Sequence, residues 1–355
     1  MRYALIGCGR ISPNHIAAAK NNLLEIVAVC DIVPEHMNGK LELPDSVKKY
    51  TDYRELLEKE KPELVAIATE SGKHAAVAID CIHAGCHVII EKPIALSMED
   101  ADRVITLAKK KGVLVCANHQ NRFNKSVQYI RTAMETGRFG RLLHGTAHIR
   151  WNRGKDYYMQ APWRGTWEQD GGALMNQCIH NIDLLRWMMG DEIDEVFAYT
   201  DNLKHPFMEA EDFGAALVKF RNGAYGVIEG TTNIYPKNLE ETLYIFGEYG
   251  TVKAGGKSVN RIEEWNFADA LDDPAYVKHA YCENPPDVYG YGHTPLYADM
   301  IEAIQTGREP YVTGEDGKKA LELVLAIYKS AYEGRPVKLP LQSCATLDFK
   351  GRFEP

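Results

Sequence analysis

GCGRIS, residues 7–12, stands between a short apolar run and a segment with the pattern of a helix. Gly7 permits the tight turn by which a chain leaves a strand and enters a helix. Gly9 leaves the backbone open to close approach by another molecule, and Ser12 is small enough to let the helix pack against the strand. The stretch therefore predicts the opening strand–turn–helix unit of a doubly wound α/β domain.

The alternation that begins at this turn continues through the first third of the chain. The expected elements are strands at 3–6, 26–30, 64–68, 87–90 and 113–117, and helices at 13–20, 53–59, 74–84 and 98–110. Strands that alternate with helices form a mostly parallel sheet covered on both faces. We therefore predict an α/β Rossmann domain over residues 1–122.

The turn and the end of the second strand together predict a dinucleotide site. The N-terminus of the helix after the turn offers free N–H groups and a partial positive charge to phosphate. Asp31 follows the second strand, where its carboxylate can accept hydrogen bonds from the hydroxyls of an adenosine ribose. A carboxylate there would repel the 2′-phosphate of NADP, so the expected cofactor is NAD. The alternative is that Asp31 only caps a turn before Pro34.

After Arg122 the pattern changes. Helices are expected at 126–136, 173–189, 295–306 and 314–333, and strands at 142–151, 195–203, 213–221, 224–233, 242–247 and 251–254. RNGA at 221–224 predicts a hairpin with Asn-Gly at its centre, and GEYG at 247–250 predicts a second tight turn. Residues 123–355 are therefore predicted to form an α+β domain with an open, mainly antiparallel sheet.

Composition narrows the classes of protein to which the chain can belong. It has 355 residues, 45% hydrophobic and 25% charged, which suits two globular domains. The formal net charge of −8 argues against a nucleic-acid partner. With no long apolar run and no signal-peptide pattern, we expect a cytoplasmic protein without a membrane partner. The eight cysteines have no metal-binding or disulfide spacing, so we expect reduced thiols and no metal.

IIEKPIA at residues 89–95 places Glu91 and Lys92 at the carboxyl end of a predicted strand, the edge where open α/β sheets bind ligands. Pro93 fixes the backbone just beyond them. A lysine at this edge can hold a substrate hydroxyl and stabilise the alkoxide that precedes hydride loss. The alternative is a solvent-facing Glu–Lys pair.

With these motifs the chain resembles the glucose-fructose oxidoreductase/inositol dehydrogenase/MocA (GFO/IDH/MocA) family. The matching pieces are GCGRIS, the Asp31 strand end, TESGKH at 69–74, EKP at 91–93 and GGALMNQCIHNIDLLRWMMG at 171–190. The resemblance implies an NAD-dependent oxidoreductase whose second domain binds the substrate and often forms oligomer contacts through its sheet, so a homo-oligomer, dimer or tetramer, is expected. It also implies NAD contacts from Gly7, Gly9, Arg10, Ile11, Asp31, Thr69, Ser71, His74, Glu91, Lys92 and Gln120.

The helix expected at 173–189 carries a second candidate catalytic group. Asn176, His180 and Asp183 follow one another at i, i+4 and i+7, so one helical face would present all three. A lone histidine would more simply be a core residue, but its neighbours on this face are polar, and the family uses the matching histidine as an acid–base group. A histidine with the ordinary pKa of about 6.5 can take a hydroxyl proton near neutral pH. We therefore predict that Lys92 and His180 are catalytic, with the base assigned to His180.

The chain departs from the inositol dehydrogenase pattern at Asn176. In those enzymes an aspartate precedes the histidine by four residues. An asparagine cannot serve as a base, but it can form hydrogen bonds with a sugar. The substitution therefore makes a free polyol a less suitable substrate.

HIRWNRGKDYYMQAPWRGTW at 148–167 is rich in arginine and aromatic residues within an otherwise acidic chain. Guanidinium groups bind carboxylates and phosphates through paired hydrogen bonds, and aromatic faces stack on sugars or nucleobases. The stretch therefore predicts an anionic, glycosidic ligand; an ordinary surface or oligomer loop is the alternative.

Together with HQNRFN at 119–124 and IYPKNLEETLYIFGEYGTVKAGG at 234–256, this loop resembles the UDP-N-acetylglucosaminuronate (UDP-GlcNAcA) 3-dehydrogenases within the family. That resemblance implies NAD-dependent oxidation of the sugar C3 hydroxyl to a ketone, for the synthesis of surface-polysaccharide sugars. The predicted substrate-binding residues are Lys92, Arg150, Trp163, Arg164, Asn176 and His180. Two alternatives stay open: a family dehydrogenase acting on a free sugar, polyol or other glycoside, and a non-enzymatic dinucleotide-binding sensor.

Overall fold

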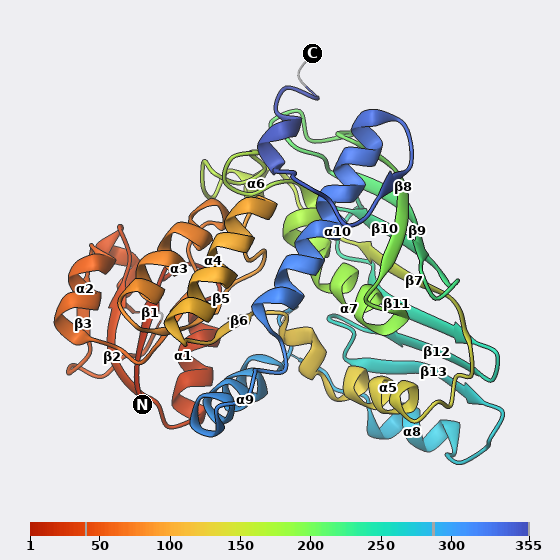
Figure 1. Ribbon diagram of the computed structural model, residues 1–355, viewed down its shortest axis with the longest axis horizontal. Coiled ribbons are helices and arrows are strands. Elements are labelled where there is room, and N and C mark those ends of the chain that lie inside the picture. The colour runs from red at the N-terminus through yellow and green to blue at the C-terminus, as the bar shows by residue number, and fades with distance from the viewer. Residues whose placement is uncertain (40, 286–287, 354–355) are drawn as a thin grey trace. The chain divides into compact units, whose positions relative to one another are not determined.

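The computed structural model describes residues 1–39, 41–285 and 288–353, and the chain divides into two compact units (Figure 1). The first unit contains residues 1–119 and 293–318, and the second contains residues 120–292 and 319–355. The segment 293–318 thus belongs to the first unit, whereas the division predicted at residue 122 assigns it to the second domain. Each unit is described by itself below.

The first unit has a six-stranded parallel sheet in the order β3-β2-β1-β4-β5-β6. Its strands are β1 Arg2–Ile6, β2 Glu25–Cys30, β3 Lys48–Tyr50, β4 Leu64–Ile67, β5 His87–Ile90 and β6 Val115–Ala117. Strand β4 is apolar and fully buried, and β5 is apolar and buried after its first residue, His87, as expected of a sheet covered on both faces. The predicted Rossmann fold is confirmed.

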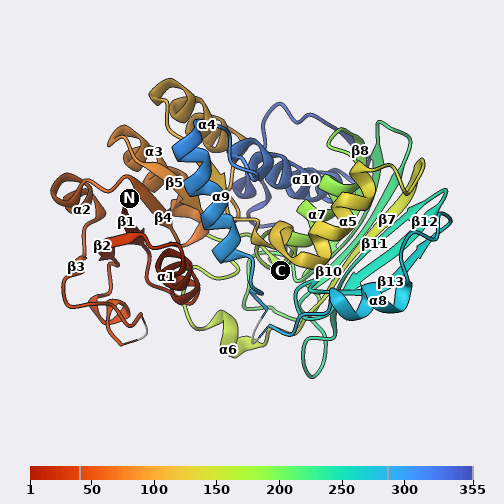
Figure 2. The ribbon, with the colours of Figure 1, turned by 90° about the horizontal axis from the view of Figure 1, so that it is seen from below.

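The helices of the first unit are α1 Ser12–Asn21, α2 Tyr53–Glu60, α3 His74–His83, α4 Met98–Lys111 and α9 His293–Thr306. Figure 2 shows α1 on one side of the sheet and α3 and α4 on the other, and α9 packs against α1. Helix α4 begins as predicted, because the Ser97 side chain accepts a hydrogen bond from the Asp100 N–H at 3.0 Å.

The second unit has an eight-stranded sheet in the order β13-β12-β11-β7-β10-β9-β8-β14. Its strands are β7 Leu142–Arg150, β8 Ile193–Asp201, β9 Phe213–Phe220, β10 Tyr225–Thr231, β11 Glu240–Gly247, β12 Gly250–Gly255, β13 Arg261–Phe267 and β14 Val337–Lys338. Neighbouring strands are antiparallel except for β7 and β10, which are parallel. The predicted mainly antiparallel sheet is confirmed, and RNGA joins β9 to β10 as a tight hairpin.

The helices of the second unit are α5 Lys125–Glu135, α6 Lys155–Tyr158, α7 Ile179–Met189, α8 Pro274–Ala280 and most of α10 Gly314–Glu333. Helix α7 packs closely on β7, since a Cβ at Gly145 would lie 2.7 Å from the sulfur of Met189. Figures 1 and 2 show α5 and α7 on the same face of the sheet. Tyr199, Leu217 and Tyr225 on β8, β9 and β10 are exposed.

Within the described ranges, no helix is both long enough and apolar enough to cross a membrane.

Candidate active site

The GCGRIS turn in the first unit has the geometry that its glycines predict. Gly7 has φ +95°, and a Cβ there would lie 2.4 Å from the backbone of Ala68, so only glycine fits. A Cβ at Gly9 would meet nothing within 4 Å, so the backbone faces open space. Ser12 is buried, and its Oγ donates to the Gly9 carbonyl at 2.6 Å. The small residue at position 12 therefore closes the turn as predicted.

Asp31 ties this turn to the end of β2. Its Oδ2 accepts the Cys8 N–H at 2.8 Å, and its Oδ1 accepts the Val33 N–H, also at 2.8 Å. Each carboxylate oxygen can accept more than one hydrogen bond, so Asp31 keeps capacity for a ribose hydroxyl. The neighbouring Ile32 is 81% exposed and offers apolar surface beside the carboxylate. The open backbone at Gly9, the N-terminus of α1 and Asp31 fit a dinucleotide.

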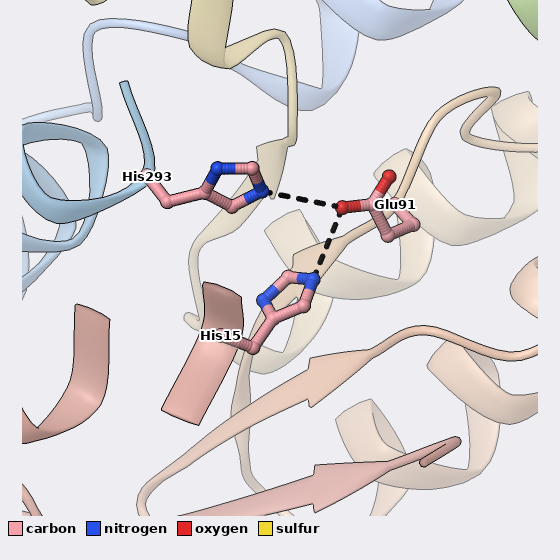
Figure 3. A group of neighbouring side chains, drawn as sticks. All are labelled: His15, Glu91 and His293. Carbon is pink, nitrogen blue, oxygen red and sulfur yellow. Dashed lines mark hydrogen bonds and ion pairs between the residues drawn. The ribbon is translucent and has the colours of Figure 1, made fainter. Parts of the chain in front are cut away.

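At the carboxyl end of β5, Glu91 is buried and surrounded by donors (Figure 3). Its Oε1 accepts from His15 Nε2 at 3.0 Å and from Asn118 Nδ2, while His293 Nε2 lies 3.8 Å away. Its Oε2 accepts the Lys92 N–H at 3.2 Å. Burial alone would raise the pKa of Glu91, but His15 and His293 hold that pKa well below its usual range. Glu91 is therefore an ionised anchor beneath the EKP turn.

The ligand atoms of His15, Glu91 and His293 lie within 4.8 Å of one another, a spacing that could hold a metal ion. The hydrogen bonds from His15 and Asn118 already satisfy the carboxylate. The carboxylate thus has hydrogen-bond donors within the protein, and the expected absence of a metal stays a prediction.

His74 holds the same turn from its other side. Its Nδ1 lies 2.7 Å from the Pro93 carbonyl oxygen and its Nε2 lies 3.1 Å from that of Thr69. The ring is 1% exposed. We predicted His74 and Glu91 as cofactor contacts; both side chains are buried and support the EKP turn, and their contacts with a cofactor stay predictions.

The predicted NAD contacts that keep some exposure in the first unit are Gly9, Arg10, Ile11, Asp31, Thr69 and Lys92. Ser71 is buried at the start of the segment leading into α3, and in the second unit Gln120 is buried too. No contact from these two side chains to a ligand follows from the structure, so their roles stay predictions.

In the second unit, α7 is preceded by a π-helical turn over Leu174–Cys178. A π-turn inserts one residue into the helix, so the regular spacing assumed from the sequence does not hold across it. Asn176 and His180 are the partly exposed residues of the stretch 171–186, whose other side chains are buried. Turns of this kind are frequent at functional sites, so the distortion falls where the sequence predicts the chemistry.

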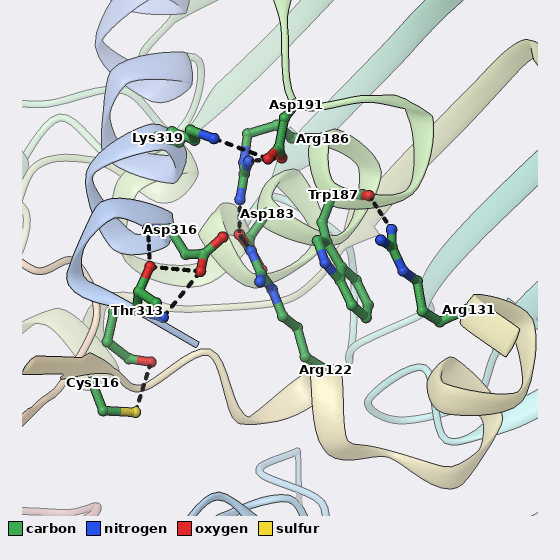
Figure 4. A network of polar contacts seen from close by, with 11 residues as sticks. Cys116, Arg122, Arg131, Asp183, Arg186, Trp187, Asp191, Thr313, Asp316 and Lys319 are labelled. Atoms are coloured by element: carbon green, nitrogen blue, oxygen red, sulfur yellow. Dashed lines mark hydrogen bonds and ion pairs between the residues drawn. The ribbon is translucent and has the colours of Figure 1, made fainter. Parts of the chain in front are cut away.

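Asp183 lies three residues after His180 on α7, but its surroundings differ from those of Asn176 and His180. It is fully buried, and Arg122 donates to both of its carboxylate oxygens at 2.7 Å (Figure 4). Arg186 joins it at 3.1 Å and extends the pairing toward the surface. The prediction that one helical face presents all three side chains stays a prediction, and Asp183 is the centre of a buried ion-pair network rather than an exposed polar group.

The arginine-rich loop is tied to the π-turn by hydrogen bonds. Asn176 donates to the buried Asp170, and Gln177 Nε2 donates to the Tyr157 hydroxyl at 3.1 Å. Arg164 Nη1 donates to the same hydroxyl at 2.7 Å. The structure thus brings the predicted residues Asn176 and Arg164 into one hydrogen-bonded group. Asp170 and Gln177 were not singled out from the sequence, because no spacing rule connects them to the loop.

Two of the predicted arginines have opposite surroundings. The Arg164 guanidinium lies 4.4 Å from the Tyr157 ring centre and 4.5 Å from that of Trp163, and it has no carboxylate partner among the described residues. Arg150 binds Glu229 on β10 with an Nε–Oε1 distance of 2.9 Å and also binds Glu240 on β11. Arg150 is therefore neutralised within the sheet, and its predicted part in substrate binding stays a prediction.

Comparison with known proteins gives a consistent result. Residues 1–119 match the oxidoreductase family with an NAD-binding Rossmann fold, and residues 127–253 match the GFO/IDH/MocA C-terminal domain. The structure is similar to the WlbA dehydrogenase from Bordetella pertussis in complex with NADH and UDP-GlcNAcA, with a TM-score of 0.89 and 39% identity over 96% of this chain and 98% of that one.

One further solved structure and one relative found by sequence are also similar to this chain. The WlbA dehydrogenase from Chromobacterium violaceum, also in complex with NADH and UDP-GlcNAcA, has a TM-score of 0.88 and 38% identity over 96% of each chain. In sequence, the myo-inositol 2-dehydrogenase of Thermotoga maritima is 29% identical over 96% of this chain and 98% of that enzyme.

Proposed function

The chain belongs to the GFO/IDH/MocA family and is an NAD-dependent sugar or polyol dehydrogenase, and on that premise we propose that it oxidises UDP-N-acetylglucosaminuronate at C3. The proposal names the nucleotide sugar bound in the two WlbA structures rather than an inositol, for which two of the sequence relatives are named. The product is the 3-keto sugar nucleotide, an intermediate for surface-polysaccharide sugars.

The observation that carries this choice is the environment of Arg164. Its guanidinium lies against the Tyr157 and Trp163 rings, and no carboxylate within the described part of the chain balances its charge. A half-buried positive charge of this kind favours an anionic ligand, and paired N–H groups suit a carboxylate or a phosphate. UDP-GlcNAcA carries both, whereas inositol carries neither. Trp163 and Tyr157 add faces on which a sugar or a base can stack.

Asn176 supports the same choice. Its amide nitrogen donates to Asp170 and its amide oxygen accepts from Gln177 Nε2 at 3.3 Å, so both contacts fix the orientation of the amide. An amide can position a sugar hydroxyl but cannot take its proton. The proton work is therefore assigned to other residues.

In the proposed reaction His180 takes the proton of the C3 hydroxyl on a ring nitrogen. The ammonium group of Lys92 orients this hydroxyl and stabilises the negative charge that develops on its oxygen. Gly7, Gly9 and Asp31 hold the dinucleotide. Bound NAD supplies the acceptor for the hydride that leaves C3.

We further propose that the chain forms a homo-oligomer through the sheet of the second unit. Tyr199 is 68% exposed and Leu217 is 58% exposed, which is apolar surface that a second copy would cover. Light scattering of the purified protein and of Leu217→Glu tests this: the variant should have a lower mass, and a monomeric wild-type protein would rule the proposal out.

A substrate panel tests the proposed activity. Purified protein is incubated with NAD and, separately, with UDP-GlcNAcA, UDP-GlcNAc, UDP-glucuronate, myo-inositol and glucose, and the absorbance of reduced nicotinamide is followed. A 2-keto acid is added in parallel, so that a protein that retains reduced cofactor can be reoxidised. We expect UDP-GlcNAcA to give the highest kcat/KM. Turnover of inositol or glucose alone would exclude the proposed substrate.

A further inference from the structure

The hydrogen bonds around His15 fix the direction in which the ring donates. A carboxylate only accepts, so the N–H of His15 lies on Nε2 and donates to Glu91 Oε1 at 3.0 Å. When the ring carries this one N–H, His15 Nδ1 accepts from the Tyr297 hydroxyl at 2.7 Å, and Tyr297 in turn accepts from Tyr3 at 2.9 Å. All of these side chains are buried. The chain of donors therefore runs one way, from Tyr3 to Glu91, and ends on the residue that accepts the Lys92 N–H.

His74 acts on the other side of the same turn. Burial lowers the pKa of His74, so the neutral ring carries one N–H. We place that proton on Nδ1, because its contact with the Pro93 carbonyl, 2.7 Å, is shorter than the 3.1 Å contact of Nε2 with Thr69. The residues on either side of Lys92 are thus each held by a different buried imidazole.

We propose that His15 and His74 are positioning residues for Lys92: the first holds the side chain of Glu91, the second holds the carbonyl of Pro93, and together they fix the turn that carries the lysine. The proposal rests on the catalytic role proposed for Lys92. Both imidazoles are buried, with protein atoms against both ring nitrogens, so neither ring is open to substrate. Their effect on the reaction therefore passes through the backbone on both sides of the lysine.

Paired substitutions separate this role from simple filling of the core. The amide of asparagine reproduces Nδ1 of histidine, and that of glutamine reproduces Nε2. His15→Gln keeps a donor for Glu91, whereas His15→Asn keeps only the contact with Tyr297. The order is reversed at His74, where His74→Asn keeps the donor for Pro93 and His74→Gln loses it.

His87 provides the matched control. It lies at the amino end of β5, the strand whose carboxyl end precedes Lys92, and its Nδ1 accepts the Leu114 N–H at 3.0 Å. His87→Asn and His87→Gln change a histidine on the same strand without touching the turn. Both control variants are expected to keep kcat within roughly threefold of wild type.

We expect kcat to fall on the order of 10- to 100-fold in His15→Asn and in His74→Gln, while the KM for NAD changes little, because a small displacement of a reacting group costs rate rather than binding. His15→Gln and His74→Asn should keep most of the activity. Equal losses of kcat in the Asn and Gln variants of each histidine, or losses of kcat that follow thermal stability alone, would overturn the proposal. If one pair of variants fails to fold, Glu91→Gln provides the second test. The glutamine retains an acceptor for His15 but can lose the acceptor for the Lys92 N–H. Wild-type kcat in Glu91→Gln would also overturn the proposal.

A substrate-free measurement keeps this inference distinct from the proposed function. Reductive methylation of Lys92 in the NAD-loaded protein, followed by mass spectrometry, reports on the surroundings of the ammonium group. We expect its rate to change on the order of threefold or more in His15→Asn and His74→Gln, but not in their partner variants. A wild-type protein that turns over no nucleotide sugar would defeat the proposed function alone, and unchanged labelling in all four variants would defeat the positioning role.

Discussion

Arg150 and Arg164 lie at opposite ends of one basic and aromatic stretch of sequence, and the fold treats them differently. Arg150 lies on β7, between Glu229 on β10 and Glu240 on β11, so two carboxylates balance its charge. Arg164 lies in a loop between two aromatic rings and donates to a neutral hydroxyl. The first arrangement links three strands of the sheet, whereas the second leaves the charge without a carboxylate partner among the described residues. The same residue type in the same motif therefore has two different environments, and we propose that only the second one suits a ligand.

The largest expected effect is at His180, and it separates catalysis from substrate binding in the second unit. His180→Ala removes the proposed base, and loss of a general base lowers kcat by about 10²- to 10⁴-fold. The KM for UDP-GlcNAcA should change much less, because Arg164 remains. Steady-state kinetics measures both, and His144→Ala, which removes an exposed histidine of β7, is the control. A higher KM with an unchanged kcat would move His180 from catalysis to binding.

The next effect tests Arg164 itself. Arg164→Ala should raise the KM for UDP-GlcNAcA on the order of 10- to 100-fold, the value of a charged hydrogen bond of about 1.5–3 kcal/mol. UDP-GlcNAc, which lacks the uronate carboxylate, identifies the group that is bound. If Arg164 binds the carboxylate, the preference for UDP-GlcNAcA over UDP-GlcNAc collapses in the variant; if it binds the diphosphate, both substrates weaken equally. An unchanged KM for both would remove Arg164 from the site.

A smaller effect is expected at Arg150, and it falls on stability. Arg150→Gln breaks two partly exposed ion pairs and leaves Glu229 and Glu240 facing each other, which should lower the free energy of unfolding by about 1 kcal/mol. Urea unfolding followed by circular dichroism measures this change. The KM for substrate should stay within roughly twofold of wild type, so a large rise would restore Arg150 to the binding site.

The smallest expected effect is the pH dependence of the difference in unfolding free energy between wild type and Arg150→Gln. Arg150 holds the pKa of Glu229 below its ordinary value. A carboxyl whose pKa is lowered in the folded state contributes stability above its unfolded pKa and loses it as the pH falls through the folded value. The stability difference between wild type and Arg150→Gln should therefore be constant from neutral pH down to the ordinary range of glutamate, and should shrink in more acidic solution. A difference that grows on acidification would contradict this assignment.

The first unit was predictable because its signals are local. Apolar runs between turn residues predicted every strand of the parallel sheet except β3, whose three residues, Lys48–Tyr50, are mostly polar and give no such run. The GCGRIS turn and the end of β5 were found because glycine geometry and strand ends depend on a few adjacent residues. In the second unit, β13, β14, α6 and α8 were missed. Only Val277 of α8 is buried, so its pattern is weak.

The parts of the candidate site that were not predicted depend on partners that are distant in sequence. The π-turn begins where the buried Glu211 accepts the Leu174 N–H at 2.8 Å, a contact that no local pattern indicates. Arg150 acquires its carboxylates only when β7 pairs with β10 and β11. Composition could identify the charges of the loop, but strand pairing decides which of them remain available.

Transfer of a label from C3 tests the central claim most directly. Protein and NAD are incubated with UDP-GlcNAcA that carries deuterium at C3, and the reduced nicotinamide is analysed by mass spectrometry. The account predicts that the deuterium appears in the reduced cofactor and that the sugar becomes a 3-ketone. Reduced cofactor without deuterium would place the oxidation at another carbon and contradict the account.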